Sequence, residues 1–302
     1  MRYFVKISYD GASYSGWQVQ PNAPTVQECL EHSLSALLRT RVPAVGAGRT
    51  DSQVNAVGYV AHFDFEGPVP ENLAAPDGKL DAMKFGCKLN AILPSGIVVH
   101  EVREVAGDLH ARFSATRREY TYFIHRTKDP FIEGHSYFFP QALDVEAMNL
   151  AAGSLVGTHD FRCFEKVGSD NKTSVCTVTE AEWRFYEPSH VALMGFQGGT
   201  YLYFRISADR FLRNMVRAVV GSLLEVGRGK RSVEDFRSLV LPVSDSADAS
   251  IPGSAAASVH ASVAAPDVEA GRARVAPDGT PFRSKAGESV PGHALFLSSV
   301  KY

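Results

Sequence analysis

Apolar residues recur with two different periods along the chain, and these periods predict a mixture of strands and helices. Residues 3–9 combine aromatic and β-branched side chains, which is typical of a strand. Five later residues are spaced as on one face of a helix: Val26, Leu30, Leu34, Leu37 and Leu38. Thr25 and Glu28 fit the pattern of a capping box at its start, so we predict a helix that ends near Arg39.

The remaining pattern predicts further strands and only a few helices. Strands are expected at 57–65, 97–105, 118–125, 175–186, 201–207 and 294–302. Helices are expected at 81–91, 144–155 and 211–226, with a short one at 232–239. Helices this few cannot cover both faces of a doubly wound sheet, so the pattern favours an α+β fold.

The order of these elements predicts two domains. Residues 1–106 hold a first α/β unit and residues 107–302 a second, and a chain of 302 residues is too long for one small core. From 242 to 288 the composition changes to Ala, Ser, Pro, Gly, Asp and Val, with Phe282 as the one aromatic residue. Such a segment buries too little apolar surface to offset the entropy of ordering, so we predict a disordered insertion within the second domain.

Bulk composition favours a cytoplasmic enzyme. Hydrophobic residues make up 45% and charged residues 21% of the chain, as in soluble globular proteins. The first residues lack the apolar core of a signal peptide, and no run approaches the roughly 18 apolar residues of a membrane span. The 4 cysteines have no C-x-x-C spacing, which argues against structural zinc and against a disulfide framework.

The net charge of −2 does not by itself indicate a nucleic-acid-binding protein. Between Arg205 and Arg231, however, seven basic residues stand against two acidic ones. This segment is either a solvated helix face or part of a positive groove for phosphates, and composition leaves both interpretations open.

Candidate chemistry centres on the turn Gly48–Asp51, with the sequence Gly-Arg-Thr-Asp. An aspartate beside an arginine and backbone N–H donors can be held ionised. Such a carboxylate can act as a nucleophile or a general base without a metal. Aspartate in a turn more often serves the turn itself, so these four residues alone do not decide between the two roles.

Seven segments in order closely resemble the tRNA pseudouridine synthase A family. Gly48–Asp51 matches its G-R-T-D signature. The other six are Tyr14–Gln18, Leu89–Pro94, His110–Ala115, Arg118–Tyr122, Gly157–Phe161, and Met215–Arg217 running into Gly221–Gly227. The resemblance implies the pseudouridine synthase fold, in which two ferredoxin-like α/β units with mainly antiparallel sheets pack around a central active-site cleft.

The resemblance also implies a role for individual residues. Asp51 matches the catalytic aspartate, and Arg217 the basic residue that pairs with it. Arg49 matches an arginine that helps to flip the target nucleotide out. Tyr120 matches the tyrosine that stacks on the target base, and Leu295 an apolar residue that lines the uracil pocket. Without the resemblance, Tyr120 could equally be a packing residue, and Arg217 could extend along its helix to solvent.

The implied reaction isomerises uridine to pseudouridine in the anticodon stem-loop of tRNA, at positions 38, 39 and 40. It breaks the N-glycosidic bond and rejoins the uracil through C5, with no redox change or net hydrolysis, so no metal or cofactor is expected. The resemblance implies a homodimer that holds tRNA across both subunits. Four arginines near the matching segments are expected to contact RNA: Arg112, Arg118, Arg210 and Arg213.

The chain departs from the family after Asp51. Gln53 replaces a glycine, which matters if that position needs a positive φ, and Asn55 replaces a histidine. Residues 294–297 are a mild change from the family's G-L-Y-L. The altered loop keeps one other hypothesis open, a catalytically weak or idle tRNA-binding module or chaperone. A third hypothesis is a synthase of the same fold that modifies other RNA sites, because target choice depends on groove shape rather than on the catalytic set.

Overall fold

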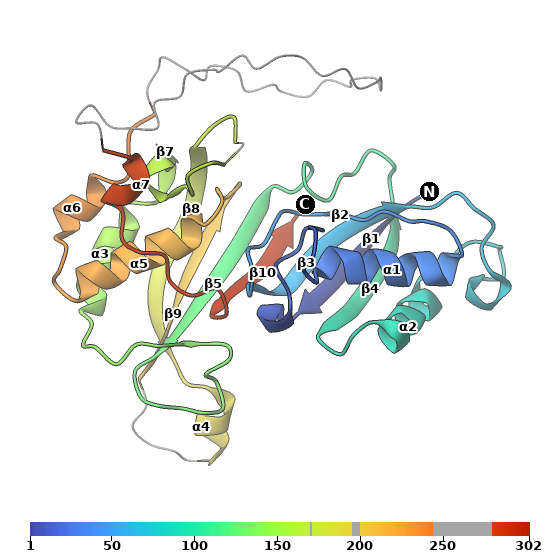
Figure 1. The fold of residues 1–302 in the computed structure, drawn as a ribbon, viewed down its shortest axis with the longest axis horizontal. Coiled ribbons are helices and arrows are strands. Elements are labelled where there is room, and N and C mark those ends of the chain that lie inside the picture. Colours follow the sequence, from blue (N-terminus) through green and yellow to red (C-terminus); the bar gives the residue numbers. More distant parts are fainter. Residues whose placement is uncertain (170, 195–199, 244–279) are drawn as a thin grey trace.

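One ten-stranded sheet runs through both halves of the chain (Figure 1). The computed structural model describes residues 1–169, 171–194, 200–243 and 280–302. The strand order is β4-β1-β3-β10-β5-β9-β8-β7, with β2 beside β3 and β6 beside β5. Pairings are antiparallel except for β10 with β3 and β5 with β6. The fold is therefore mixed α+β as predicted, but the strands of the two predicted units are joined in a single sheet.

The predicted helices and strands are confirmed, with ends that differ by at most four residues. In the first half, the elements are β1 (Arg2–Tyr9), α1 (Val26–Leu38), β2 (Val45–Gly46), β3 (Asn55–Asp64), α2 (Ala82–Ile92) and β4 (Ile97–Val105). In the second, they are β5 (Arg117–His125), β6 (Tyr137–Phe138), α3 (Val145–Gly153), β7 (Gly157–Asp160), β8 (Val175–Tyr186), α4 (Ser189–Met194), β9 (Tyr201–Ala208), α5 (Met215–Gly227), α6 (Val233–Arg237), α7 (Phe282–Lys285) and β10 (Leu295–Lys301). The sequence pattern did not predict β2, β6, β7, α4 or α7.

Side-chain caps explain where α1, α2 and α3 begin. The Thr25 hydroxyl accepts the Glu28 N–H at 3.4 Å before α1, and Asp81 and Asp144 accept backbone N–H groups in the same way before α2 and α3. Each cap of this kind typically contributes about 1 kcal/mol to helix stability.

Helix α5 begins at Met215, four residues later than predicted. Asn214 adopts a left-handed conformation with φ of 65°, which does not fit inside a right-handed helix. Residues 209–214 therefore form a loop, although their apolar spacing continues that of the helix.

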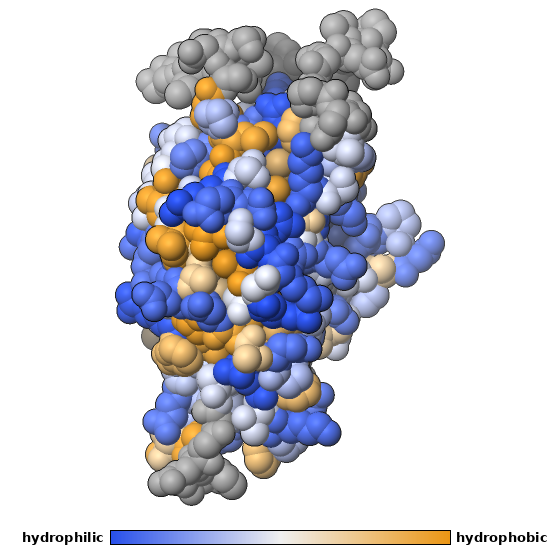
Figure 2. Space-filling model, turned by 90° about the vertical axis from the view of Figure 1, so that its left-hand side faces the viewer, coloured by the Kyte–Doolittle hydropathy of each residue, from blue (hydrophilic) through white to orange (hydrophobic). Residues whose placement is uncertain are grey.

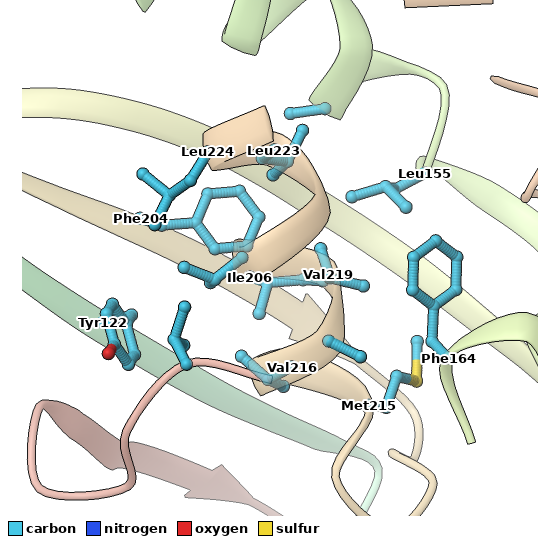
Figure 3. Packing of buried hydrophobic residues seen from close by; sticks show 14 of the residues in the cluster. Tyr122, Leu155, Phe164, Phe204, Ile206, Met215, Val216, Val219, Leu223 and Leu224 are labelled. Atoms are coloured by element: carbon cyan, nitrogen blue, oxygen red, sulfur yellow. The ribbon is translucent and has the colours of Figure 1, made fainter. Parts of the chain in front are cut away.

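Two hydrophobic clusters lie on the same face of the sheet. Helix α5 packs between the strands and residues such as Leu155 and Phe164 in the larger cluster (Figure 3). Helices α1 and α2 cover the smaller one. In the β10–β5 register, Leu295 of the larger cluster lies opposite Tyr122, and Leu297 of the smaller one lies opposite Tyr120. The Tyr120 side chain packs against both clusters, so it lies where the two halves meet.

The opposite face of the second half carries a network of charged side chains beside a group of aromatic rings. Arg205 on β9 forms ion pairs of 2.6 Å with both Glu180 and Glu182 on β8. Arg184 is half exposed and pairs with Glu182 at 2.8 Å. At the end of the molecule where α3 and α6 lie, exposed apolar surface is bordered by hydrophilic residues (Figure 2). No helix in the part of the chain that the structure describes is long and apolar enough to span a bilayer.

The predicted insertion is shorter at its C-terminal end than expected. Most of it, residues 244–279, lies outside the described residues. Residues 280–288 are packed: they include α7, and the Gly287 N–H donates to the Ser222 hydroxyl on α5 at 2.8 Å. A side chain at Gly221 would collide with the Glu288 carbonyl, so glycine allows this close contact.

Two histidines hold loop 110–114 through backbone contacts. His62 on β3 is 3% exposed, and its Nδ1 accepts the Ala111 N–H at 3.1 Å. Nδ1 of His110 accepts the N–H groups of Arg112 and Phe113 at 3.0 and 3.2 Å. Both rings must therefore be neutral at Nδ1. Burial, followed by the nearby positive charge of Arg2, lowers the pKa of His62 to about 4 and also lowers that of His110.

The free energy of unfolding should fall as the pH drops from about 6.5 to about 4. A lowered pKa means that the folded state binds fewer protons than the unfolded state. The neutral histidine therefore stabilises the fold fully above the unfolded pKa of about 6.5, and this stabilisation is lost as the pH falls toward the folded pKa. We expect a loss of about 2–3 kcal/mol attributable to His62. Urea unfolding at several pH values measures it; a His62→Gln variant with an unchanged pH dependence would contradict the assignment.

Candidate active site

Asp51 lies in the loop between β2 and β3, whose backbone is held on several sides. The Tyr59 hydroxyl donates to the Gly48 carbonyl at 2.5 Å. The Thr50 hydroxyl is hydrogen-bonded to the Tyr9 hydroxyl at 2.9 Å. The Trp17 N–H donates to the Thr50 carbonyl at 3.3 Å. These contacts place Thr50 in the core and leave the Asp51 side chain at its surface.

Three glycines pack directly on this loop, two from the connection between β1 and α1 and one from the segment before β10. Gly11 packs against the Val54 carbonyl, Gly16 against the Thr50 carbonyl, and Gly292 against the Ser52 carbonyl. A Cβ at any of these positions would approach backbone closer than real side chains do. Gly16 also has a φ of 91°, which favours glycine. The family motif Tyr14–Gln18 thus packs against the loop that carries Asp51.

The two departures after Asp51 have opposite structural consequences. Gln53 has a φ of 65°, so the position does adopt the left-handed conformation for which glycine is best suited. Asn55 is 1% exposed; its Oδ1 accepts the Gly11 N–H at 2.8 Å and its Nδ2 donates to the His293 carbonyl at 2.6 Å. Gln53 therefore adds backbone strain, whereas Asn55 ties the loop to both neighbouring segments.

Arg217 and Asp51 come together from opposite halves of the molecule. Nη1 of Arg217 lies 3.6 Å from Oδ2 of Asp51, and the two side chains are 23% and 28% exposed. The Arg217 Nε donates to the Val290 carbonyl at 2.7 Å, and the Val290 N–H returns a bond to the Arg217 carbonyl at 3.3 Å. The segment before β10 thus aims the guanidinium at Asp51. This contact to Val290 could not be predicted from the sequence pattern.

Tyr120 lies within electrostatic range of the same carboxylate. Burial raises the pKa of the Tyr120 hydroxyl, the negative charge of Asp51 raises it further, and the charge of Arg118 opposes both. The partly exposed ring of Tyr120 meets Phe211 edge-on, with centroids 5.1 Å apart and planes at 89°. The pattern analysis missed Phe211 because it placed this residue in a helix.

Leu295 is 4% exposed and belongs to the larger cluster together with Val54, which closes the Asp51 loop. It lies opposite Tyr122, which is two residues after Tyr120 on β5 and on the same face of the sheet. Arg49 is exposed beside Asp51. The structure therefore brings Asp51, Arg217, Tyr120 and Leu295 to one region, while their chemical roles stay predictions.

The four arginines expected at RNA have different environments. Arg112 and Arg213 are exposed, and Arg112 lies over the ring of Phe113, which is 77% exposed. Arg210 is half-buried with a 3.4 Å contact to Asn171. Arg118 differs, because its guanidinium donates to backbone carbonyls of three loops. These carbonyls give Arg118 a structural role that the sequence did not predict.

Among the described residues, no group of three or more His, Cys, Asp or Glu side chains could hold a metal ion. Two surface hollows of about 490 and 620 Å³ do not include Asp51 in their lining; one is lined by Val167 and residues from 281 to 289, and one by residues 38–42 and 64–70. The chemistry available at Asp51 is thus that of a reachable carboxylate, a guanidinium and a phenol.

Comparisons with known proteins show the family to which the chain belongs. Residues 151–259 match the family described as tRNA pseudouridine synthase. The whole chain is 42% identical to tRNA pseudouridine synthase A of Bacteroides thetaiotaomicron and 41% identical to that of Bacteroides fragilis, covering 90% and 96% of those proteins. The chain belongs to the tRNA pseudouridine synthase A family. The resemblance inferred from its seven motifs is thereby confirmed.

One further relative and one solved structure are also similar to this member of the tRNA pseudouridine synthase A family. The protein of the same name from Exiguobacterium sibiricum is 39% identical over 79% of this chain and 87% of its own length. A solved chain from a Cbf5-Nop10-Gar1 complex covers 74% of this chain and 54% of its own at 12% identity, with a TM-score of 0.25. No conclusion on the fold rests on that last similarity.

Replacing Gln53 with glycine should stabilise the protein. Because φ at this position is 65°, glycine removes the left-handed strain, and we expect a gain of about 1 kcal/mol in the free energy of unfolding. Urea unfolding of Gln53→Gly and of the control Gln53→Ala measures the effect. A Gln53→Gly variant less stable than the alanine variant would refute the strain.

Gly221→Ala should disturb the support of Arg217. The added methyl group would displace the Glu288 carbonyl, and with it the segment that carries Val290, at a cost of about 1–3 kcal/mol in stability. Gly153→Ala is the matched control, because a Cβ there meets nothing within 4 Å. Thermal unfolding together with an assay of pseudouridine formation should show both losses in the first variant; equal behaviour of the two variants would contradict the packing argument.

Proposed function

We propose that this chain is an isomerase that converts uridine to pseudouridine in tRNA, with Asp51 as its catalytic carboxylate. The observation that carries the proposal is the ion pair of 3.6 Å between Asp51 and Arg217. It lies beside Tyr120 in a chain whose full-length relatives bear the name tRNA pseudouridine synthase A. No cofactor is needed for a reaction without redox change or net hydrolysis.

Each side chain has a distinct task in this proposal. The target base leaves its stack at a cost of about a few kcal/mol, and the Tyr120 ring returns about 1–3 kcal/mol by stacking on it. Leu295 lines the uracil pocket, and Arg49 helps to evert the nucleotide. Asp51 then acts on the everted uridine by attack at C1′ or C6, or by abstracting a ribose proton, while Arg217 balances its charge.

The proposed substrate is the anticodon stem-loop, at positions 38, 39 and 40, bound across a cytoplasmic homodimer. Phosphate contacts come from Arg112, Arg210 and Arg213, with the salt dependence that such contacts confer. In this proposal the fold consists of two ferredoxin-like units, residues 1–106 and 107–302, packed around a central active-site cleft. Two hydrophobic clusters, one on each side of the β10 junction, support that division.

A second function, a weak or idle tRNA-binding module, is favoured by one observation. Gln53 occupies a left-handed position two residues after Asp51, where the family has glycine. Strain at that point would act on the loop that carries the carboxylate.

Asp51→Asn should abolish pseudouridine formation while tRNA binding persists. The amide keeps the size of the side chain but loses its charge, so we expect a rate at least about 10³-fold lower with a similar Kd. Tritium release from tRNA labelled at uracil C5, together with filter binding, measures both quantities.

Glu234→Gln, an exposed carboxylate on α6, is the control and should keep the full rate. Full activity of Asp51→Asn would overturn the catalytic assignment. A wild-type protein that binds tRNA but releases no tritium would support the idle binding module instead.

A further inference from the structure

Arg118 connects three loops through its guanidinium group. Its Nε and Nη2 donate to the Ala47 carbonyl at 3.3 and 3.0 Å, and Nη2 also donates to the Arg112 carbonyl at 2.6 Å. Nη1 donates to the carbonyls of Asp209 and Ala115 at 2.7 and 3.4 Å. The side chain is therefore occupied by backbone acceptors from separate parts of the fold.

Each of the three loops carries a different part of the candidate site. The loop that begins at Ala47 carries Asp51 four residues later. Loop 110–115 displays Arg112, and loop 209–214 delivers Phe211 to the edge of Tyr120. On β5, Arg118 is two residues before Tyr120 and so lies on the same side of the strand. One side chain thus sets the spacing between the carboxylate, an RNA-facing loop and the stacking ring.

We propose that Arg118 is a positioning residue, which fixes the Asp51 loop against the two loops beside it. The inference rests on the proposed function. Only arginine offers five N–H donors in a planar, rigid fork, and lysine would supply a single ammonium head to the same carbonyls. Ala47 is 1% exposed, so its carbonyl would be left without a partner when Arg118 is removed.

The role makes a prediction that separates it from phosphate binding. A displacement of about 1 Å in a catalytic group can cost about 10²-fold in rate, so losing Arg118 should slow the chemical step and leave affinity for tRNA unchanged. A phosphate contact would behave differently: its loss weakens binding and reduces the slope of log K against log salt by about 1.

The test compares Arg118→Gln with Arg184→Gln in the full chain. The control removes the same charge from an exposed arginine on β8, outside the candidate site. Single-turnover rates at saturating enzyme and the Kd of an unmodified tRNA transcript are measured at several salt concentrations. We expect a rate about 10²-fold lower in Arg118→Gln, with wild-type Kd and salt slope, and a wild-type rate in Arg184→Gln. A weaker Kd with a reduced salt slope and a normal saturated rate would overturn the proposal.

Two additional measurements keep the result interpretable. Arg118→Lys keeps the charge and should fold if the glutamine variant does not; we expect an intermediate rate at wild-type Kd, and a full rate would overturn the proposal. Hydrogen exchange of residues 47–54 needs no activity, and it should be faster in Arg118→Gln than in Arg184→Gln. Equal exchange of residues 47–54 in the two variants would contradict the positioning role. A wild-type protein that forms no pseudouridine would contradict only the proposed function.

Discussion

The candidate site depends on one constraint, the fixed backbone of the loop that carries Asp51. A carboxylate can meet a substrate atom within a few tenths of an ångström only if the chain beneath it does not move. Three glycines from two segments pack directly on this loop, and the buried Thr50 hydroxyl is hydrogen-bonded to that of Tyr9. Arg118 adds a link to the loops on either side. The Asp51 carboxylate is exposed enough to be reached, while the backbone of its loop is held by packing and hydrogen bonds.

The guanidinium opposite Asp51 is held in a complementary way. Arg217 sits in the first turn of α5, a helix that is buried along most of its length. Its direction is set by the Val290 carbonyl, at the end of a segment that crosses the helix through contacts with Gly221 and Ser222. The ion pair therefore joins a strand–loop–strand unit to a helix from the other half of the chain. Neither half contains the full set of groups.

The sequence predicted the elements well because most are amphipathic and begin with clear signals, such as Thr25 before α1 and Asp81 before α2. It placed the start of α5 too early, because apolar spacing does not reveal the left-handed Asn214. It also extended the insertion to 288, because a segment of small residues reads as disordered even where glycine packs against a helix.

The site itself was predictable only through motifs. Asp51, Tyr120 and Arg217 are far apart in the sequence, and no periodicity indicates that they meet. Gln53 was identified as a departure on sequence grounds, and its φ of 65° shows why that position matters. Arg118 was assigned to RNA because a charged residue beside a motif suggests phosphate. The carbonyls that its guanidinium contacts come from remote loops, so only three-dimensional contacts could reveal this second role.

The place of β10 has a consequence for how the protein is made. This strand, residues 295–301, lies between β3 and β5 and connects the two halves of the sheet. During synthesis the edge of β5 that pairs with residues 295–301, together with residues 55 and 56 of β3, stays unpaired until β10 itself has been translated. The growing chain must therefore keep an open sheet edge from pairing with other chains, and a product that stops short of residue 295 would display that edge permanently.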